Sequence, residues 1–108
     1  MVAHAKRFDV FWVSLDPTIG AEIKKTRPCL IVSPNEANRR LLTVIIAPLT
    51  TKPKHYAFRP LISMDGKECE VALDQLRCID QRRLHKKMGT LQRDDAIAVT
   101  RLLQEMFA

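Results

Sequence analysis

Polar and apolar residues alternate near the start of the chain with the two-residue period of a β-strand. Within residues 9–15, the side chains of Phe11, Val13 and Leu15 fall on one side of an extended backbone. Trp12 falls on the other side. This alternation predicts an opening strand. The polar segment that follows, through residue 25, contains proline and glycine and predicts an exposed loop.

Short runs of β-favouring residues predict further strands. They cover residues 28–32, 42–47, about 56–62, 70–73 and 75–79. Pro48 is expected to end the strand over residues 42–47. Asp65 and Gly66 predict a hairpin turn, and Asp74 predicts a bend between the last two strands.

The end of the chain follows a helical period instead. One face of the predicted helix carries Ala96, Val99, Leu103 and Met106. Asp94 and Asp95 stand in its first turn, where negative charge is favourable against the helix dipole. Short strands followed by one helix, without βαβ alternation, predict a mainly β fold: a small antiparallel barrel or a strongly bent sheet.

Size and composition fit one compact domain over residues 1–108, with 46% apolar and 28% charged residues. The net charge of +6 lies entirely in residues 1–60, which carry ten basic and four acidic groups. This asymmetry fits an anionic partner and also fits a solvated basic surface without a ligand. A second basic cluster is expected to be a solvated face that could extend a track for a nucleic-acid backbone: Arg82, Arg83, His85, Lys86 and Lys87.

The cysteines do not form a disulfide or metal pattern. There are three of them, without CxxC spacing, and Cys29 and Cys78 are interpreted as buried structural thiols rather than nucleophiles. The histidines also lack ligand spacing, so neither a metal nor another cofactor is expected. Residues 1–7 lack the apolar stretch of a signal peptide and no window resembles a membrane span, so we expect a cytoplasmic protein.

The strongest candidate for chemistry is Arg27, which a charged loop delivers to the start of an apolar strand in the sequence GAEIKKTRPCLIVS of residues 20–33. Pro28 fixes its own backbone torsion and biases Arg27 toward an extended conformation. The guanidinium is therefore aimed reproducibly. Taken alone, an arginine at a strand start is also ordinary surface charge.

Three ordered blocks give this arginine a context. They are DVFWVSLDPTIGAEIKKTRPCLIVSP at residues 9–34, APLT at 47–50 and LDQLRCID at 73–80. Together they resemble the MazF/PemK (Kid) toxins of bacterial toxin-antitoxin pairs, which are ribosome-independent endoribonucleases. The resemblance covers nearly the whole chain. It implies an SH3-like antiparallel barrel with a C-terminal α-helix and a homodimer that holds single-stranded RNA in a groove largely at the dimer interface.

The resemblance also implies roles for individual residues. Arg27 matches the catalytic arginine, Thr50 matches its hydroxyl partner, and Asp74 is a candidate for the general base. The residues expected to bind RNA are Glu22, Lys24, Lys25, Thr51, Lys54, His55, Gln75 and Arg77.

These residue types suit RNA cleavage without a metal ion. When a ribose 2′-hydroxyl attacks the adjacent phosphorus, charge grows on the phosphate oxygens, which Arg27 and Thr50 can stabilise with hydrogen bonds. The expected products are a 2′,3′-cyclic phosphate and a 5′-hydroxyl. The base is either Asp74 or Arg27 itself, because Ala72 and Ala21 replace an arginine and a histidine that some relatives carry.

Two other functions remain open from the sequence. One is a toxin of the same fold that poisons a topoisomerase and does not need Arg27. The other is a barrel that binds RNA without cutting it. The resemblance further implies a cognate antitoxin protein, with DNA contact only through that antitoxin if at all. One local departure is Phe8, which stands where the family usually has glycine before the first-strand aspartate.

Overall fold

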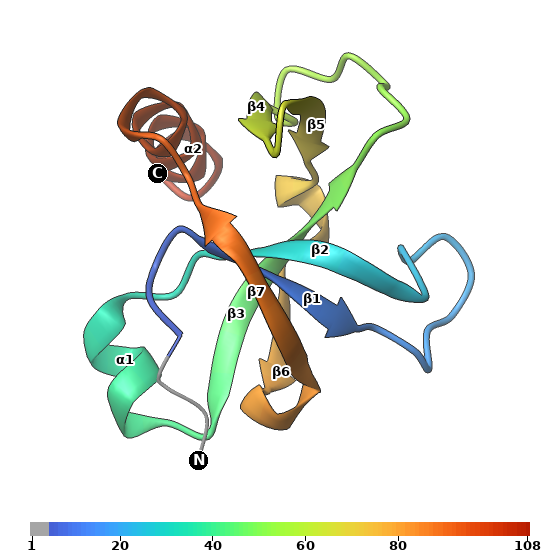
Figure 1. Ribbon diagram of the computed structural model, residues 1–108. Coiled ribbons are helices and arrows are strands. Elements are labelled where there is room, and N and C mark those ends of the chain that lie inside the picture. The colour runs from blue at the N-terminus through green and yellow to red at the C-terminus, as the bar shows by residue number, and fades with distance from the viewer. Residues whose placement is uncertain (1–4) are drawn as a thin grey trace.

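The computed structural model describes residues 5–108, and this part of the chain forms seven strands and four helical segments (Figure 1). The strands are β1 (Asp9–Ser14), β2 (Thr26–Ile31), β3 (Thr43–Thr50), β4 (Leu61–Met64), β5 (Lys67–Val71), β6 (Arg77–Asp80) and β7 (Leu84–Thr90). The helices are α1 (Asn35–Arg40) and α2 (Arg93–Met106), with short 3-10 turns η1 (Leu73–Gln75) and η2 (Gln81–Arg83).

The strands form one curled antiparallel sheet in the order β4-β5-β3-β2-β1-β7. β3 is paired along both edges, with β2 on one side and with β6 and then β5 on the other. On this second edge, β6 pairs with residues 43–46 of β3 and β5 pairs with residues 49–50. The turn η1 connects β5 to β6 in the chain. The prediction of a small antiparallel barrel with a C-terminal helix is confirmed, and the sheet curls into a half-barrel.

Apolar side chains on both faces of the sheet are buried, so the core has two clusters. Val10 and Leu30 belong to the cluster that α2 covers through the fully buried Val99. Phe11 and Ile31, their neighbours in the chain, belong to the other cluster. Alternation along β1 and β2 thus explains both clusters. In α2 the predicted face is confirmed for its first three positions, whereas Met106 is exposed near the helix end.

Two strand boundaries were predicted wrongly. β3 continues through Pro48 to Thr50, because the Pro48 carbonyl accepts a hydrogen bond from the Ala72 N–H at 2.9 Å although proline has no N–H to donate. The predicted strand over residues 56–62 is mostly an exposed turn, and β4 begins only at Leu61. Its aromatic residues favour strands, but polar contacts hold this segment as a loop.

Other elements were missed or divided differently. The predicted strands over 70–73 and 75–79 are β5, the turn η1 and β6. β7 was not predicted because its sequence, LHKKMGT, lacks alternation, yet it pairs with β1. The short polar helix α1 was also not predicted, and it is held by the buried Asn38, whose Nδ2 donates to the Ser33 carbonyl at 3.0 Å.

Three turn residues have a left-handed backbone conformation that bears on the sequence predictions. Asp65 and Gly66 have φ values of +52° and +73°, so the predicted hairpin turn is confirmed and is of the doubly left-handed kind that suits a twisted hairpin. Phe8 has φ of +74°, a conformation that favours glycine. The local turn is therefore formed without the family's glycine, and the Phe8 side chain packs against the core.

We expect Gly66→Ala to lower the free energy of unfolding by about 1 kcal/mol, measured by urea denaturation at fixed protein concentration. A Cβ at Gly66 would meet no atom within 4 Å, so the loss would be due to backbone strain alone. Gly66→Asn should lose less, because asparagine tolerates a positive φ. Equal stability of Gly66→Ala and the native protein would contradict this assignment.

Candidate functional site

Arg27 and Thr50 lie at the same end of the β2–β3 pair. The register joins Cys29 to Pro48, and Arg27 and Thr50 are each two residues further along their strands. Arg27 is half-buried, and its Nε donates to the Lys24 carbonyl at 2.8 Å. Within residues 5–108 this is its one side-chain hydrogen bond, so both Nη groups remain available to a ligand.

Thr50 is a buried hydroxyl at the end of β3, with 9% of its surface exposed. Its Oγ1 accepts a hydrogen bond from the Lys52 N–H at 3.1 Å. Because the oxygen accepts this bond, the hydroxyl proton can be donated to another group. Thr50 is thus equipped to provide a neutral donor close to a cationic one.

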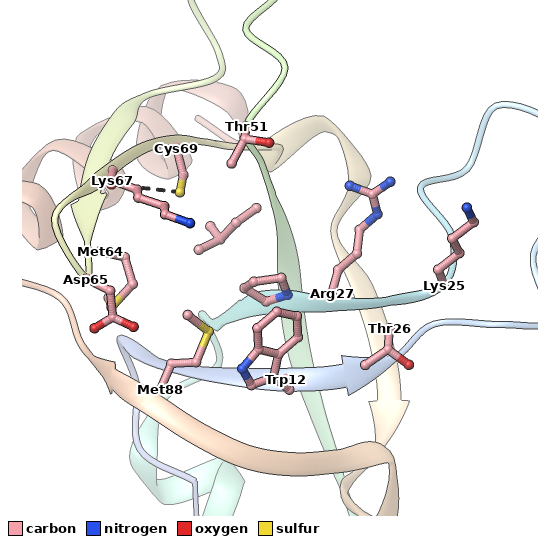
Figure 2. Close-up of a pocket in the computed structure, with 12 residues that line it drawn as sticks. Trp12, Lys25, Thr26, Arg27, Thr51, Met64, Asp65, Lys67, Cys69 and Met88 are labelled. Atoms are coloured by element: carbon pink, nitrogen blue, oxygen red, sulfur yellow. Dashed lines mark hydrogen bonds between the residues drawn. The ribbon is translucent and has the colours of Figure 1, made fainter.

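A cavity of about 470 Å³ opens beside Arg27. Figure 2 shows Arg27, Lys25 and Thr26 at one end, Met64, Cys69 and Met88 at the other, and Trp12 between them. Thr51 and Lys67 also line it. The wall is mostly apolar; Lys25 and Arg27 place two cationic groups at one end, and Lys67 places a third at the other end, beside Cys69. This cavity contains three of the predicted site residues: Lys25, Arg27 and Thr51.

Four other predicted residues line a second cavity of about 360 Å³: Glu22, Asp74, Gln75 and Arg77. Three of their side chains bind the loop between β1 and β2. Gln75 Oε1 accepts from the Ile23 N–H at 2.7 Å, and Arg77 Nη1 donates to the Leu15 carbonyl at 2.6 Å. Glu22 Oε1 accepts from the Ile19 N–H at 2.6 Å within the same loop. The structure therefore divides seven of the predicted residues between two cavities, whereas Thr50, Lys24, Lys54 and His55 line neither of them.

Asp74 forms an ion pair that the sequence did not reveal. Its Oδ1 and Oδ2 accept from Arg59 Nε and Nη2 at 2.8 and 2.9 Å. The Arg59 side chain is 10% exposed and that of Asp74 is 32% exposed. The hydrogen bonds from Arg59 hold the pKa of Asp74 below its usual range. The candidate base is consequently occupied and weakened as a proton acceptor in this conformation.

Lys54 and His55 lie in the exposed loop between β3 and β4, as expected, but a residue absent from the prediction fixes their backbone. Glu70 is only 1% exposed, and its two carboxylate oxygens accept from the Lys54 and His55 N–H groups, each at 3.0 Å. The Lys54 bond is the main cause that lowers the pKa of Glu70, and it outweighs the opposing effect of burial. Glu70 of β5 is paired with Thr50 of β3 in the antiparallel register.

The second basic cluster is largely engaged in structural contacts. Arg83 Nη1 donates to the Ser14 and Asp16 carbonyls at 3.2 and 3.0 Å, and Lys87 lies 3.3 Å from Asp9. Arg82 forms a bidentate pair with Asp80. The Lys87 contact joins β7 to β1, and the Arg83 contacts hold the end of β1 and the start of the loop that follows it, whereas the Arg82 pair is local.

The thiols differ from one another. Cys29 is buried as expected, and burial raises the pKa of its thiol to about 12. The expectation for Cys78 was wrong: it is exposed, because Ile79 faces the core and alternation turns Cys78 outward on β6.

Among residues 5–108, no group of three or more His, Cys, Asp or Glu side chains is placed to hold a metal ion. His4 and most of the segment examined for a signal peptide lie outside the described residues.

No helix within residues 5–108 has the length and apolar character needed to span a membrane.

Comparison with solved structures identifies the fold. MazF from Deinococcus radiodurans superposes with a TM-score of 0.86 at 23% identity, covering 98% of each chain. An endoribonuclease in complex with its cognate antitoxin, from a mycobacterial species, superposes with a TM-score of 0.81 at 19% identity, covering 95% of this chain and 94% of that one. The half-barrel with its terminal helix is thus the MazF fold.

Sequence relatives and a family model identify the family. The endoribonuclease toxin MazF of Escherichia coli (strain K12) is 33% identical over 84 residues, covering 77% of this chain and 76% of that protein. The endoribonuclease EndoA of Bacillus subtilis (strain 168) is 30% identical over 105 residues, covering 92% and 90%. Residues 6–107 match the model described as PemK-like, MazF-like toxin of type II toxin-antitoxin system. The chain belongs to this toxin family, as its three sequence blocks predicted.

We expect Glu70 to make stability sensitive to acid. A carboxylate whose folded pKa is lowered stabilises the protein above its unfolded pKa, and this contribution is lost as the pH falls through the lower folded value. Stability should therefore decrease from about pH 4 downward, the ordinary range of a glutamate. Glu70→Gln should lower the free energy of unfolding at pH 7 by about 1–3 kcal/mol, because one backbone N–H would lose its acceptor.

Urea denaturation across this pH range measures both effects. Glu68→Gln is a matched control, since Glu68 is an exposed residue of the same strand. An unchanged pH dependence in Glu70→Gln would show that the buried carboxylate does not contribute.

Proposed function

We propose that this toxin is an endoribonuclease that cleaves single-stranded RNA at Arg27 and Thr50 without requiring a metal ion. One observation carries the assignment to these residues: Arg27, whose two Nη groups are available beside an open cavity, and Thr50 lie at the same end of one strand pair. The endoribonuclease names of its relatives support the activity and do not favour a topoisomerase poison or a non-catalytic RNA-binding barrel.

The chemistry follows from the donors. The ribose 2′-oxygen loses its proton to a base and forms a bond to the adjacent phosphorus, and the bond from phosphorus to the 5′-oxygen breaks. Arg27 binds the phosphate oxygens with parallel charged hydrogen bonds while their negative charge grows, and Thr50 adds a neutral donor. The departing 5′-oxygen takes up a proton. A 2′,3′-cyclic phosphate and a 5′-hydroxyl remain.

Cationic and polar side chains around Arg27 would hold the RNA backbone. Lys24, Lys25, Thr51, Lys54 and His55 are all exposed and flank the strand ends that carry the catalytic pair. Lysines in such positions attract phosphate groups over a range set by the ionic strength. We expect these five residues to contribute to RNA affinity more than to the rate of cleavage.

The proposed setting is a cytoplasmic homodimer controlled by an antitoxin protein. Exposed apolar side chains such as Trp12 and Ile45 fit burial against a second copy. The basic surface fits an acidic antitoxin segment that would compete with RNA. The structures of related folds with an antitoxin bound, among them MazE-MazF from Deinococcus radiodurans, support such a partner.

Cleavage of single-stranded RNA in the presence of a chelator tests the assignment. Arg27→Ala should reduce kcat/KM about a hundredfold or more, because the charge on the phosphate would lose its main stabilising donor. Thr50→Val should also reduce the rate while keeping the side-chain shape. Arg39→Ala, which removes an exposed arginine on α1, serves as the control. No cleavage by the native protein, or equal cleavage by native protein and Arg27→Ala, would overturn the proposal.

Light scattering after size exclusion tests the dimer. We expect a mass about twice the 12.4 kDa of the chain. A single-chain mass across the concentrations at which RNA is cleaved would contradict the dimer while leaving the assignment of Arg27 intact.

A further inference from the structure

The turn η1 lies between two long loops that are far apart in the chain. One loop joins β1 to β2 over residues 15–25, and the other joins β3 to β4 over residues 51–60. In Figure 1 both extend toward the same side of the molecule, away from α1 and α2. Consecutive residues of η1, Asp74 and Gln75, each bind one of these loops.

Asp74 holds the loop over residues 51–60 through Arg59. The pair is bidentate, the arrangement in which a carboxylate holds a guanidinium most strongly. Arg59 is mostly buried, and its guanidinium also lies over the Tyr56 ring, 5.2 Å from the centroid. Tyr56 in turn stacks on Phe58, with centroids 5.1 Å apart. The pair therefore orients several side chains of a loop that is otherwise exposed.

Gln75 holds the loop over residues 15–25 near the end that leads into β2. Its Oε1 accepts from the Ile23 N–H at 2.7 Å, and its Nε2 donates to the Ala21 carbonyl at 3.4 Å. The residue after Ile23 is Lys24, whose carbonyl accepts the bond from Arg27 Nε. Gln75 therefore holds the loop segment whose Lys24 carbonyl in turn orients the Arg27 side chain.

The second loop reaches the site in a similar way. It begins directly after Thr50, and its Lys52 N–H donates to the Thr50 hydroxyl oxygen. Glu70 anchors the middle of this loop at Lys54 and His55, and the Asp74 pair anchors its end at Arg59. Arg27 and Thr50 therefore each contact a loop that is held by η1.

We propose that η1 positions both halves of the Arg27 site, with Asp74 acting through Arg59 on the Thr50 side and Gln75 acting through Ile23 on the Arg27 side. Asp74 is then a positioning residue and not the general base. The consequence for catalysis rests on the proposed RNA cleavage, whereas the consequence for loop order does not. Both carboxylate oxygens of Asp74 are already used by Arg59.

Hydrogen exchange measured by mass spectrometry on the full chain tests the loop order directly. Asp74→Asn and Arg59→Gln should each speed amide exchange in residues 51–60 roughly three- to tenfold, and the double variant should be no faster than either single one. Exchange in residues 19–25 should not change. Gln75→Leu should have the opposite pattern, with faster exchange in residues 19–25 and no change in residues 51–60.

RNA cleavage by the same variants separates positioning from proton transfer. A positioning role predicts equal losses of kcat/KM in Asp74→Asn and Arg59→Gln, no further loss in the double variant, and an unchanged shape of the pH profile of kcat. A base would behave differently. Asp74→Asn would then lower kcat about a hundredfold or more and remove the acidic limb of the profile, while Arg59→Gln would not.

Asp80→Asn is the matched control, because Asp80 also forms a bidentate pair with an arginine, Arg82. The Arg82 side chain is 91% exposed, and the two residues are only two positions apart, so this pair holds no long loop. It should change neither loop exchange nor cleavage. The proposal is overturned if the base pattern is found, or if Asp74→Asn and Arg59→Gln leave exchange in residues 51–60 unchanged. Native protein that fails to cleave RNA would remove the proposed function while the exchange results still decide the role of η1.

Discussion

The pairing of β3 on both edges is the constraint on which the rest of the molecule depends. One edge aligns β3 with β2, and the other takes β6 and β5 in turn. A shift of one residue in either register would move buried side chains such as Ile46 and Leu49 to the wrong face. The core thereby fixes the register, and the register brings Arg27 and Thr50 to a common strand end.

The same pairing leaves a gap between β5 and β6 that η1 fills. The two loops near this gap bury few apolar side chains, so their order must come from polar anchors. The buried Glu70 and the Asp74–Arg59 pair provide such anchors for the loop over residues 51–60. Their lowered carboxylate pKa values have one physical origin, donors that favour the charged form.

The charge of the surface has two different uses. Several cations that belong to one basic cluster in the sequence bind carbonyls or carboxylates of neighbouring strands, as Arg83 and Lys87 do. Arg27, by contrast, keeps both Nη groups available beside a cavity. The net charge of the chain does not distinguish these two kinds of cation. Only a cation with available donors, such as Arg27, can bind an anionic partner without breaking internal contacts.

The sequence by itself determined the family, the mainly β fold with a terminal helix, and Arg27 and Thr50 as candidates. Hydrophobic period and local motifs contain this information, because a strand face, a proline beside an arginine and a helical stripe are short-range patterns. The strand ends near Pro48 and Tyr56, and the strand β7, were decided by contacts with distant segments, whereas α1 is held by the contact of the buried Asn38 with Ser33. The roles of Glu70 and Arg59 were likewise decided by the tertiary structure, since each acts on a partner fifteen or sixteen residues away. No spacing rule reports such contacts, because only the folded sheet brings the partners together.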